Sequence, residues 1–181
     1  FLTIFLSLIL VLPLATKASY NPKQQQVYIP ASENREGNVY LAGQSIVIDG
    51  NINGDLIAIG QSIEVNGQIG GDLIAAAQSL NINGEIKGNI RALGENINLN
   101  GTTEKNITLL GANINFNETA NTGWDFLFLA SNTNIKGSIA GELRGIAEII
   151  NINGKIGKNV NITLNDRANG SLNIYSDAII N

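Results

Sequence analysis

Four carboxylates recur at one position of a repeated pattern in this sequence: Asp55, Asp72, Asp125 and Glu142. Asp55 and Asp72 are 17 residues apart, and so are Asp125 and Glu142. Two carboxyl groups a few ångströms apart form the acid pair of many glycoside-cleaving enzymes. We favour a structural interpretation, because Asn takes this position in the other repeats and limits repulsion between the like charges of a solvated edge.

The sequence gives little support for a metal site or a catalytic nucleophile. Residues 49–55 (DGNINGD) match the first half of an EF-hand calcium loop, but Gly60 stands where that loop ends in Glu, so we interpret them as a corner. The chain has no Cys and no His, which excludes thiol nucleophiles, Ser-His-Asp chemistry and the usual zinc sites. With a net charge of -4 and 11 unclustered Lys and Arg, nucleic acid is not expected as a partner. We expect no cofactor, no metal and no enzymatic activity.

Aromatic side chains gather in residues 124–128 (WDFLF). Phe126 and Phe128 fall at positions expected to face inward, and Gly145 in the next repeat leaves room for the Phe128 ring. Trp124 replaces a corner glycine, so Trp124 and Asp125 are a candidate docking site.

These residues belong to a repeat of 17 residues, clearest in residues 54–101. Self-similarity at a short period is typical of stacked architectures, in which each unit is covered by the next. We interpret Thr122 and Gly123 as a two-residue insertion before the sixth repeat. Counting positions 1 to 17 in each repeat, the repeats begin at Gly37, Gly54, Gly71, Gly88, Lys105, Trp124, Gly141 and Lys158.

Positions 3, 10, 12 and 16 are mostly Ile, Leu or Val, and the residues between them are expected to be polar and outward-facing. Asn-Gly or Asp-Gly at positions 13 and 14 suits a corner with positive φ. Two further corners are marked by Gly at position 1 and by Gly or Ala at position 7. Three short strands and three corners per repeat predict an all-β fold, a triangular parallel β-helix (solenoid) of about eight turns. The uneven glycine spacing favours the right-handed form over a left-handed hexapeptide helix. Stacked Asn side chains are expected to hydrogen-bond along the axis.

The pattern of residues 54–69, repeated in residues 71–86, resembles the repeat of the bactofilin family. It is carried by Gly54, Leu56, Ala58, Ile63, Val65, Gly67 and Ile69. The resemblance covers about residues 37–164. It implies a right-handed triangular β-helix that assembles end to end into filaments without nucleotide and serves as a scaffold for envelope or cell-shape machinery at membranes.

The N-terminal part of the chain departs from the cytoplasmic members of that family. Residues 1–14 are uncharged and mostly apolar, and Thr16 and Ala18 are small residues suited to a cleavage site. We interpret residues 1–18 as a signal peptide or an N-terminal membrane anchor, which places the rest of the chain on the extracytoplasmic side of a bacterial membrane. Residues 19–36, with Pro22 and Pro30, are predicted to be a linker or cap of which only residues 27–29 pack. Residues 37–181 are predicted to form the β-helix domain.

The candidate interaction residues are Tyr28, Trp124, Asp125, Ile174 and Tyr175. The terminal turns of a β-helix present unpaired strand edges, so either another copy pairs at Ile174 and Tyr175 or the chain continues past Asn181. The sequence therefore predicts a structural, polymer-forming scaffold of the cell envelope, with copies of itself and membrane or envelope components as partners. The alternative is an exported binding module that recognises a glycan or a protein with one face.

Overall fold

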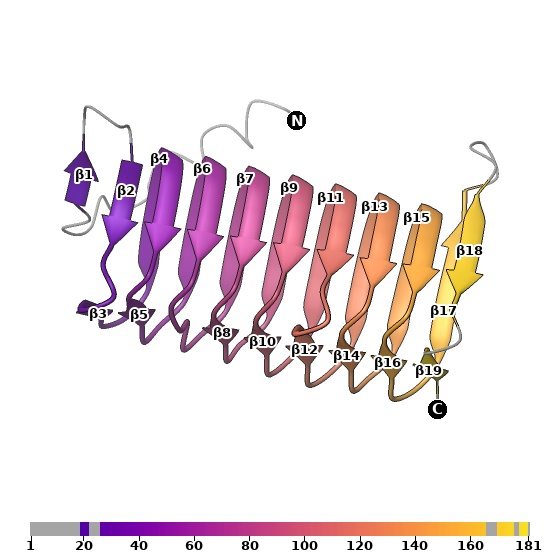
Figure 1. Cartoon of the computed structure of the whole chain (residues 1–181). Coiled ribbons are helices and arrows are strands. Elements are labelled where there is room, and N and C mark those ends of the chain that lie inside the picture. Colours follow the sequence, from indigo (N-terminus) through magenta and orange to yellow (C-terminus); the bar gives the residue numbers. More distant parts are fainter. Residues whose placement is uncertain (1–18, 22–25, 166–169, 176–177, 181) are drawn as a thin grey trace, which may run out of the picture.

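The computed structural model describes residues 19–21, 26–165, 170–175 and 178–180. Within these ranges the chain is all-β, a parallel β-solenoid of about eight turns in which each turn lies beside the next (Figure 1). The same ranges hold no helix long and apolar enough to cross a membrane. The predicted signal peptide or anchor, residues 1–18, lies outside the described residues.

Most turns consist of one long strand and one short strand, and in the turn that contains Ile69 the place of the short strand is taken by single bridges of Ile69 to Ile52 and Ile86. The long strands have ten residues and pair in parallel through the whole stack. They are β4 (Val39–Ile48), β6 (Leu56–Val65), β7 (Leu73–Ile82), β9 (Ile90–Leu99), β11 (Ile107–Phe116), β13 (Phe126–Ile135) and β15 (Leu143–Ile152). The short strands are β3 (Asn34–Arg35), β5 (Asn51–Ile52), β8 (Glu85–Ile86), β10 (Thr102–Thr103), β12 (Asn121–Thr122), β14 (Ser138–Ile139), β16 (Lys155–Ile156) and β19 (Ile179–Ile180). The remaining strands are β1 (Ser19–Asn21), β2 (Gln26–Ile29), β17 (Val160–Leu164) and β18 (Ser171–Ile174).

The long strand forms two of the three predicted sides. Its buried residues alternate at positions 3 and 5 and again at positions 10 and 12, as in Leu56, Ala58, Ile63 and Val65. Between these two pairs the alternation of buried and outward residues shifts by one residue. The residue at position 8 is not among those paired with the neighbouring strand. The strand therefore bends at positions 7 and 8. The corner that the sequence predicts there is a bend within one strand rather than a break between two.

The core is a narrow column of stacked ladders in which identical positions of successive turns are in register. Position 10, for example, aligns Ile46 with Ile63 and then with Leu80, all fully buried. Polar ladders run beside it, as the sequence predicts. At the position 13 corner, Asn66, Asn83 and Asn100 each donate a side-chain hydrogen bond of 2.7 Å to the preceding turn.

The glycines at position 14 are required for a reason other than the predicted one. Gly37 is the glycine with positive φ, at 76°, whereas the position 14 glycines lie outside that region. What requires glycine there is the close approach of neighbouring turns: a Cβ at Gly84 would lie 2.7 Å from the Asn66 carbonyl oxygen and closer still to that of Gly67. The turns are stacked so tightly at this corner that no side chain fits.

The predicted insertion at Thr122 and Gly123 is wrong by four residues. Asn117 still bonds to Asn100, 17 residues earlier, but Asn121 pairs with Thr102, 19 residues earlier. The two extra residues therefore lie between Asn117 and Asn121, where the Ala120 amide donates to the Asn117 carbonyl at 2.9 Å and closes a wider corner. Thr122 keeps a regular inward position and is buried.

The stack begins before Gly37. Strand β2 pairs in parallel with β4, and β3 pairs in parallel with β5, so residues 26–35 already form most of a turn. Val27 and Ile29 pack as predicted and are buried. Residues 19–36 are predicted to be a linker or cap. Within them β1 acts as a cap, because it pairs antiparallel with β2.

Candidate functional site

The C-terminal turn exposes side chains that are buried in every complete turn. Leu172, Ile174 and Ile180 are in register with Ile150, Ile152 and Ile156, which are fully buried. In the last turn the same positions are 42%, 53% and 42% exposed, because no described strand covers them. The described strands β17, β18 and β19 each pair on one side only. Among the described residues, this end of the solenoid is an apolar strand edge that no further strand covers.

Tyr175 stands at the same end. Its amide donates to the Ile152 carbonyl at 2.9 Å, which holds the residue against the preceding turn. Its side chain is exposed, and its hydroxyl lies 3.5 Å from Asn151 Oδ1. The structure therefore places the two predicted assembly residues, Ile174 and Tyr175, side by side on the open edge.

The N-terminal end is built differently. Strand β1 lies along β2 in antiparallel pairing, and the inward-facing Val27 and Ile29 are buried. Arg35 takes the inward position in register with Ile52, and its guanidinium pairs with Glu33 at 2.8 Å. An inward-pointing charge is one of the devices that keep a sheet edge from adding strands. The ends of the solenoid are thus unlike each other, and the open one is C-terminal.

Tyr28 belongs to this N-terminal end. Its hydroxyl donates to Asp49 Oδ2 at 2.9 Å. This hydrogen bond favours the neutral phenol and raises the pKa of Tyr28 above its ordinary value. Asp49, the first residue of the calcium-loop-like segment, also accepts from Asn66 Nδ2, so its carboxylate is held within the corner ladder.

The aromatic turn divides into a core part and a surface part, as predicted. Phe126 and Phe128 are buried, and their rings meet edge to face with centroids 5.9 Å apart. Phe116 from the preceding turn packs against Phe126 in the same way at 5.3 Å. Trp124 projects from the corner and is 57% exposed.

The recurring carboxylates hold neighbouring turns together. Asp55 Oδ1 accepts from the Asp72 amide at 2.8 Å, and Asp125 Oδ1 accepts from the Glu142 amide at 2.9 Å. Asn at this position plays the same part, as Asn38 does toward the Asp55 amide. Position 2 therefore favours a side chain with an acceptor oxygen, mostly Asp or Asn, and Glu142 plays the same part by accepting from Asn159 Nδ2 at 3.2 Å.

Asp72 is the most strongly engaged member of this ladder. Partial burial opposes its ionisation, but hydrogen bonds from the Asn89 amide and the Arg91 guanidinium outweigh that effect and lower the pKa of Asp72. A general acid for glycoside cleavage needs a raised pKa. The geometry thus favours the structural interpretation of these carboxylates.

The predicted site residues lie in three separate places: Tyr28 near the N-terminal end, Trp124 and Asp125 on the sixth turn, and Ile174 and Tyr175 on the last. The sequence analysis missed a fourth feature, an apolar face along the middle of the solenoid. It centres on position 6, where Ile59, Leu93, Leu110, Leu129 and Ile146 point outward and are 45–57% exposed. We call this row the outer ladder.

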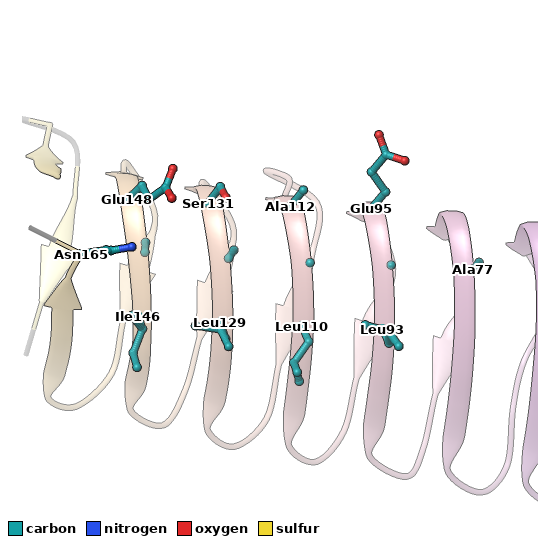
Figure 2. A pocket seen from close by; sticks show the side chains of 14 residues that line it. Ala77, Leu93, Glu95, Leu110, Ala112, Leu129, Ser131, Ile146, Glu148 and Asn165 are labelled. Carbon is teal, nitrogen blue, oxygen red and sulfur yellow. The ribbon is translucent and has the colours of Figure 1, made fainter. Parts of the chain in front are cut away.

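A shallow groove of about 630 Å³ runs beside the outer ladder (Figure 2). Its floor consists of the small residues of position 7, from Ala77 through Gly94 and Gly111 to Ala147. On the far side of this floor stand the residues of position 8, which include Glu95 and Glu148. The solenoid therefore carries a ridge of large apolar side chains next to a groove whose floor consists of Gly and Ala.

Comparison with known proteins gives no match to a family model, to a curated protein or to a solved structure.

Proposed function

We propose that this chain is a structural, polymer-forming scaffold protein of the bacterial cell envelope, whose solenoids join end to end without nucleotide. The observation that carries the proposal is the apolar C-terminal turn, which no described strand covers. Another copy that added its strands to β17, β18 and β19 would extend the sheets of the stack and cover Leu172, Ile174 and Ile180. Growth from a pair of copies into a filament also requires a contact at the N-terminal end, where β1 pairs on one side only among the described strands.

The expected gain is modest for a single junction. Covering three half-exposed aliphatic side chains contributes about 1 kcal/mol each, and hydrogen bonds along the new strand edge add to this. The cost of joining two molecules is of similar size or larger. Assembly should therefore depend strongly on protein concentration, as expected of a filament that needs no nucleotide.

Family membership and location are parts of the same proposal. The bactofilin-like pattern of residues 54–86 supports a filament-forming scaffold, and the apolar residues 1–14 support a position at or beyond a membrane. The structural role of the position 2 carboxylates supports a protein without enzymatic activity. Its partners would be further copies and components of the membrane or envelope.

The test is electron microscopy and light scattering of the purified 181-residue chain without nucleotide. We expect filaments in the wild type and their loss in Ile174→Lys, because the junction would bury an unpaired charge. Ile180→Lys tests the second sheet at the same end. Glu64→Lys, an outward position in the middle of the stack, is the matched control and should leave filaments intact. Thermal melts check that each variant is folded.

A wild-type chain that remains a monomeric rod at high concentration would contradict end-to-end assembly and favour the alternative of an exported binding module. Filaments that persist unchanged in both lysine variants would show that the C-terminal edge is not the junction.

A further inference from the structure

The outer ladder belongs to strands whose sequence is typical of sheets covered on both faces. Residues 56–60 (LIAIG), 73–77 (LIAAA) and 126–130 (FLFLA) are continuous apolar runs. Strands with one solvated face alternate apolar and polar residues, whereas strands buried on both faces read as unbroken apolar runs. One face of these strands packs in the solenoid core, and the other is exposed. The pattern therefore points to a covering partner for the outer face.

The charges beside the outer ladder are arranged in two opposed rows. Arg91 and Arg144 stand at position 4, on one side of the ladder, and Glu95 and Glu148 stand at position 8, on the other. Arg91 shares β9 with Glu95, and Arg144 shares β15 with Glu148. Both arginines are more than half exposed, although Arg91 also pairs with Asp72 at 2.6 Å and Arg144 pairs with Glu142.

Only one symmetric arrangement of two copies brings opposite charges together across this face. Two copies can place their outer ladders together with parallel axes in two ways, both with two-fold symmetry. A two-fold axis along the solenoid makes the copies point the same way, and position 4 of each then faces position 8 of the other in the same turn. A two-fold axis along the strands makes the copies point in opposite directions, and position 4 then faces position 4. The first arrangement pairs Arg with Glu four times; the second sets Arg against Arg and Glu against Glu.

The repeat of the solenoid agrees with the first arrangement. With the axis at position 6, position 4 faces position 8, and the outer ladders of the two copies meet along the axis, each with its Gly and Ala floor beside it. Since both copies have the same rise of about 4.8 Å per turn, each turn meets its own counterpart along the whole face. The face measures about 24 Å by about 13 Å, from β6 to β15 and from position 4 to position 8. That is the size of a functional patch and less than a standard interface, so we expect a dissociation constant on the order of micromolar or weaker.

A membrane surface fits this face less well. Lipid-facing protein surfaces are usually flanked by Lys and Arg, which bind anionic headgroups. Here one flank carries glutamates, the chain has a net charge of -4, and its only Trp, Trp124, lies at a corner rather than on the outer ladder.

We propose that the outer ladder is a lateral contact between two copies of this chain that lie side by side and point the same way, with Arg91 and Arg144 of each copy facing Glu95 and Glu148 of the other. This contact uses the long face of the solenoid and is independent of the end-to-end junction.

A charge-swap experiment tests the pairing. The full chain is studied by sedimentation velocity with Ile174→Lys present throughout, so that end-to-end assembly does not obscure the result. Glu95→Arg with Glu148→Arg should weaken dimerisation by on the order of tenfold or more, because four arginines then face four arginines. Adding Arg91→Glu and Arg144→Glu should restore most of the affinity. Glu64→Arg, on another side of the solenoid, is the matched control and should change little.

Single cysteines test the direction, since the chain has no Cys of its own. Spin labels on Ala76→Cys and, separately, on Ile146→Cys should each give a short distance between copies, because each turn meets its own counterpart. In the opposite arrangement the labels would lie several turns apart, on the order of 20 Å.

Four outcomes would overturn the proposal: a chain that stays monomeric at several hundred micromolar, no effect of reversing the glutamates, long distances at both labels, or a monomer that binds lipid vesicles through this face. None of these outcomes bears on filament formation by the chain with Ile174 intact, so the two proposals can fail separately.

Discussion

Gly145 lies directly next to the ring of Phe128 in the core. The two residues are in register in the parallel pair of β13 and β15, and a Cβ on Gly145 would come within 2.5 Å of Phe128 Cζ. In most other turns this position holds Leu or Ala, as in Leu109 and Ala92. The aromatic turn therefore fits only because its neighbour has no side chain.

This relationship predicts that Gly145→Leu destabilises the protein by about 1 to 3 kcal/mol through overpacking. Urea unfolding followed by circular dichroism measures the change. Phe128→Ala alone should also destabilise, by about 3 to 5 kcal/mol, because it leaves a cavity. The double variant Phe128→Ala with Gly145→Leu should be more stable than the sum of the two changes predicts. Strict additivity would contradict the contact.

The sequence predicts this contact because the repeat sets the register. Once Phe128 and Gly145 share position 5 in adjacent turns, they must be neighbours in a stack. The same logic predicts the core ladders and the Asn ladders. It fails where the period changes, because the repeat pattern does not indicate which corner widens. The sequence predicts the insertion at Thr122 and Gly123, whereas the structure has it between Asn117 and Asn121.

The outer ladder was missed for a different reason. A strand period of two identifies one apolar face and predicts that the residues between are polar. Position 6 is nevertheless apolar from Ala42 to Ile146, so the signal was present in the sequence. The sequence predicts that the last turn has an unpaired strand edge. It does not predict the closed N-terminal end, because no repeat pattern indicates the antiparallel pairing of β1 or the inward position of Arg35.

A second prediction concerns Thr133, which takes position 10 between Ile114 and Ile150 in the core. It is fully buried, and among the described residues its hydroxyl oxygen has no hydrogen-bond partner. Thr133→Val replaces the hydroxyl with a methyl group of similar size and should stabilise the protein by about 1 kcal/mol. Val65→Thr, which buries a hydroxyl at position 12 of another turn, is the opposite control and should destabilise. Equal stability of wild type and Thr133→Val would mean that the hydroxyl is satisfied in solution.

A third prediction separates two uses of glycine. Gly84→Ala should destabilise by about 3 kcal/mol, because the new Cβ would meet the carbonyl oxygen of the preceding turn. Gly37→Ala should cost about 1 to 2 kcal/mol for another reason, its φ of 76° with open space around the Cβ position. Asn tolerates such a φ, so Gly37→Asn should recover part of the loss, whereas Gly84→Asn should be no better than Gly84→Ala. Rescue by Asn at both positions, measured by urea midpoints, would contradict the steric account of Gly84.

The last prediction concerns acid stability and Asp72. Its pKa in the folded protein lies below the ordinary value of 3.8, because the Asn89 amide and the Arg91 guanidinium stabilise the carboxylate more than burial destabilises it. A carboxyl group with a depressed folded pKa contributes stability that is complete above its unfolded pKa and is lost as the pH falls through the folded pKa. Asp72→Asn keeps an acceptor oxygen for the Asn89 amide but loses the charge that Arg91 binds. The variant should therefore be less stable than wild type at pH 7, and the difference in melting temperature should shrink when both are measured below pH 3.8. A difference that stays constant from pH 7 to pH 2.5 would show that the Asp72 charge does not contribute to the stability of the stack.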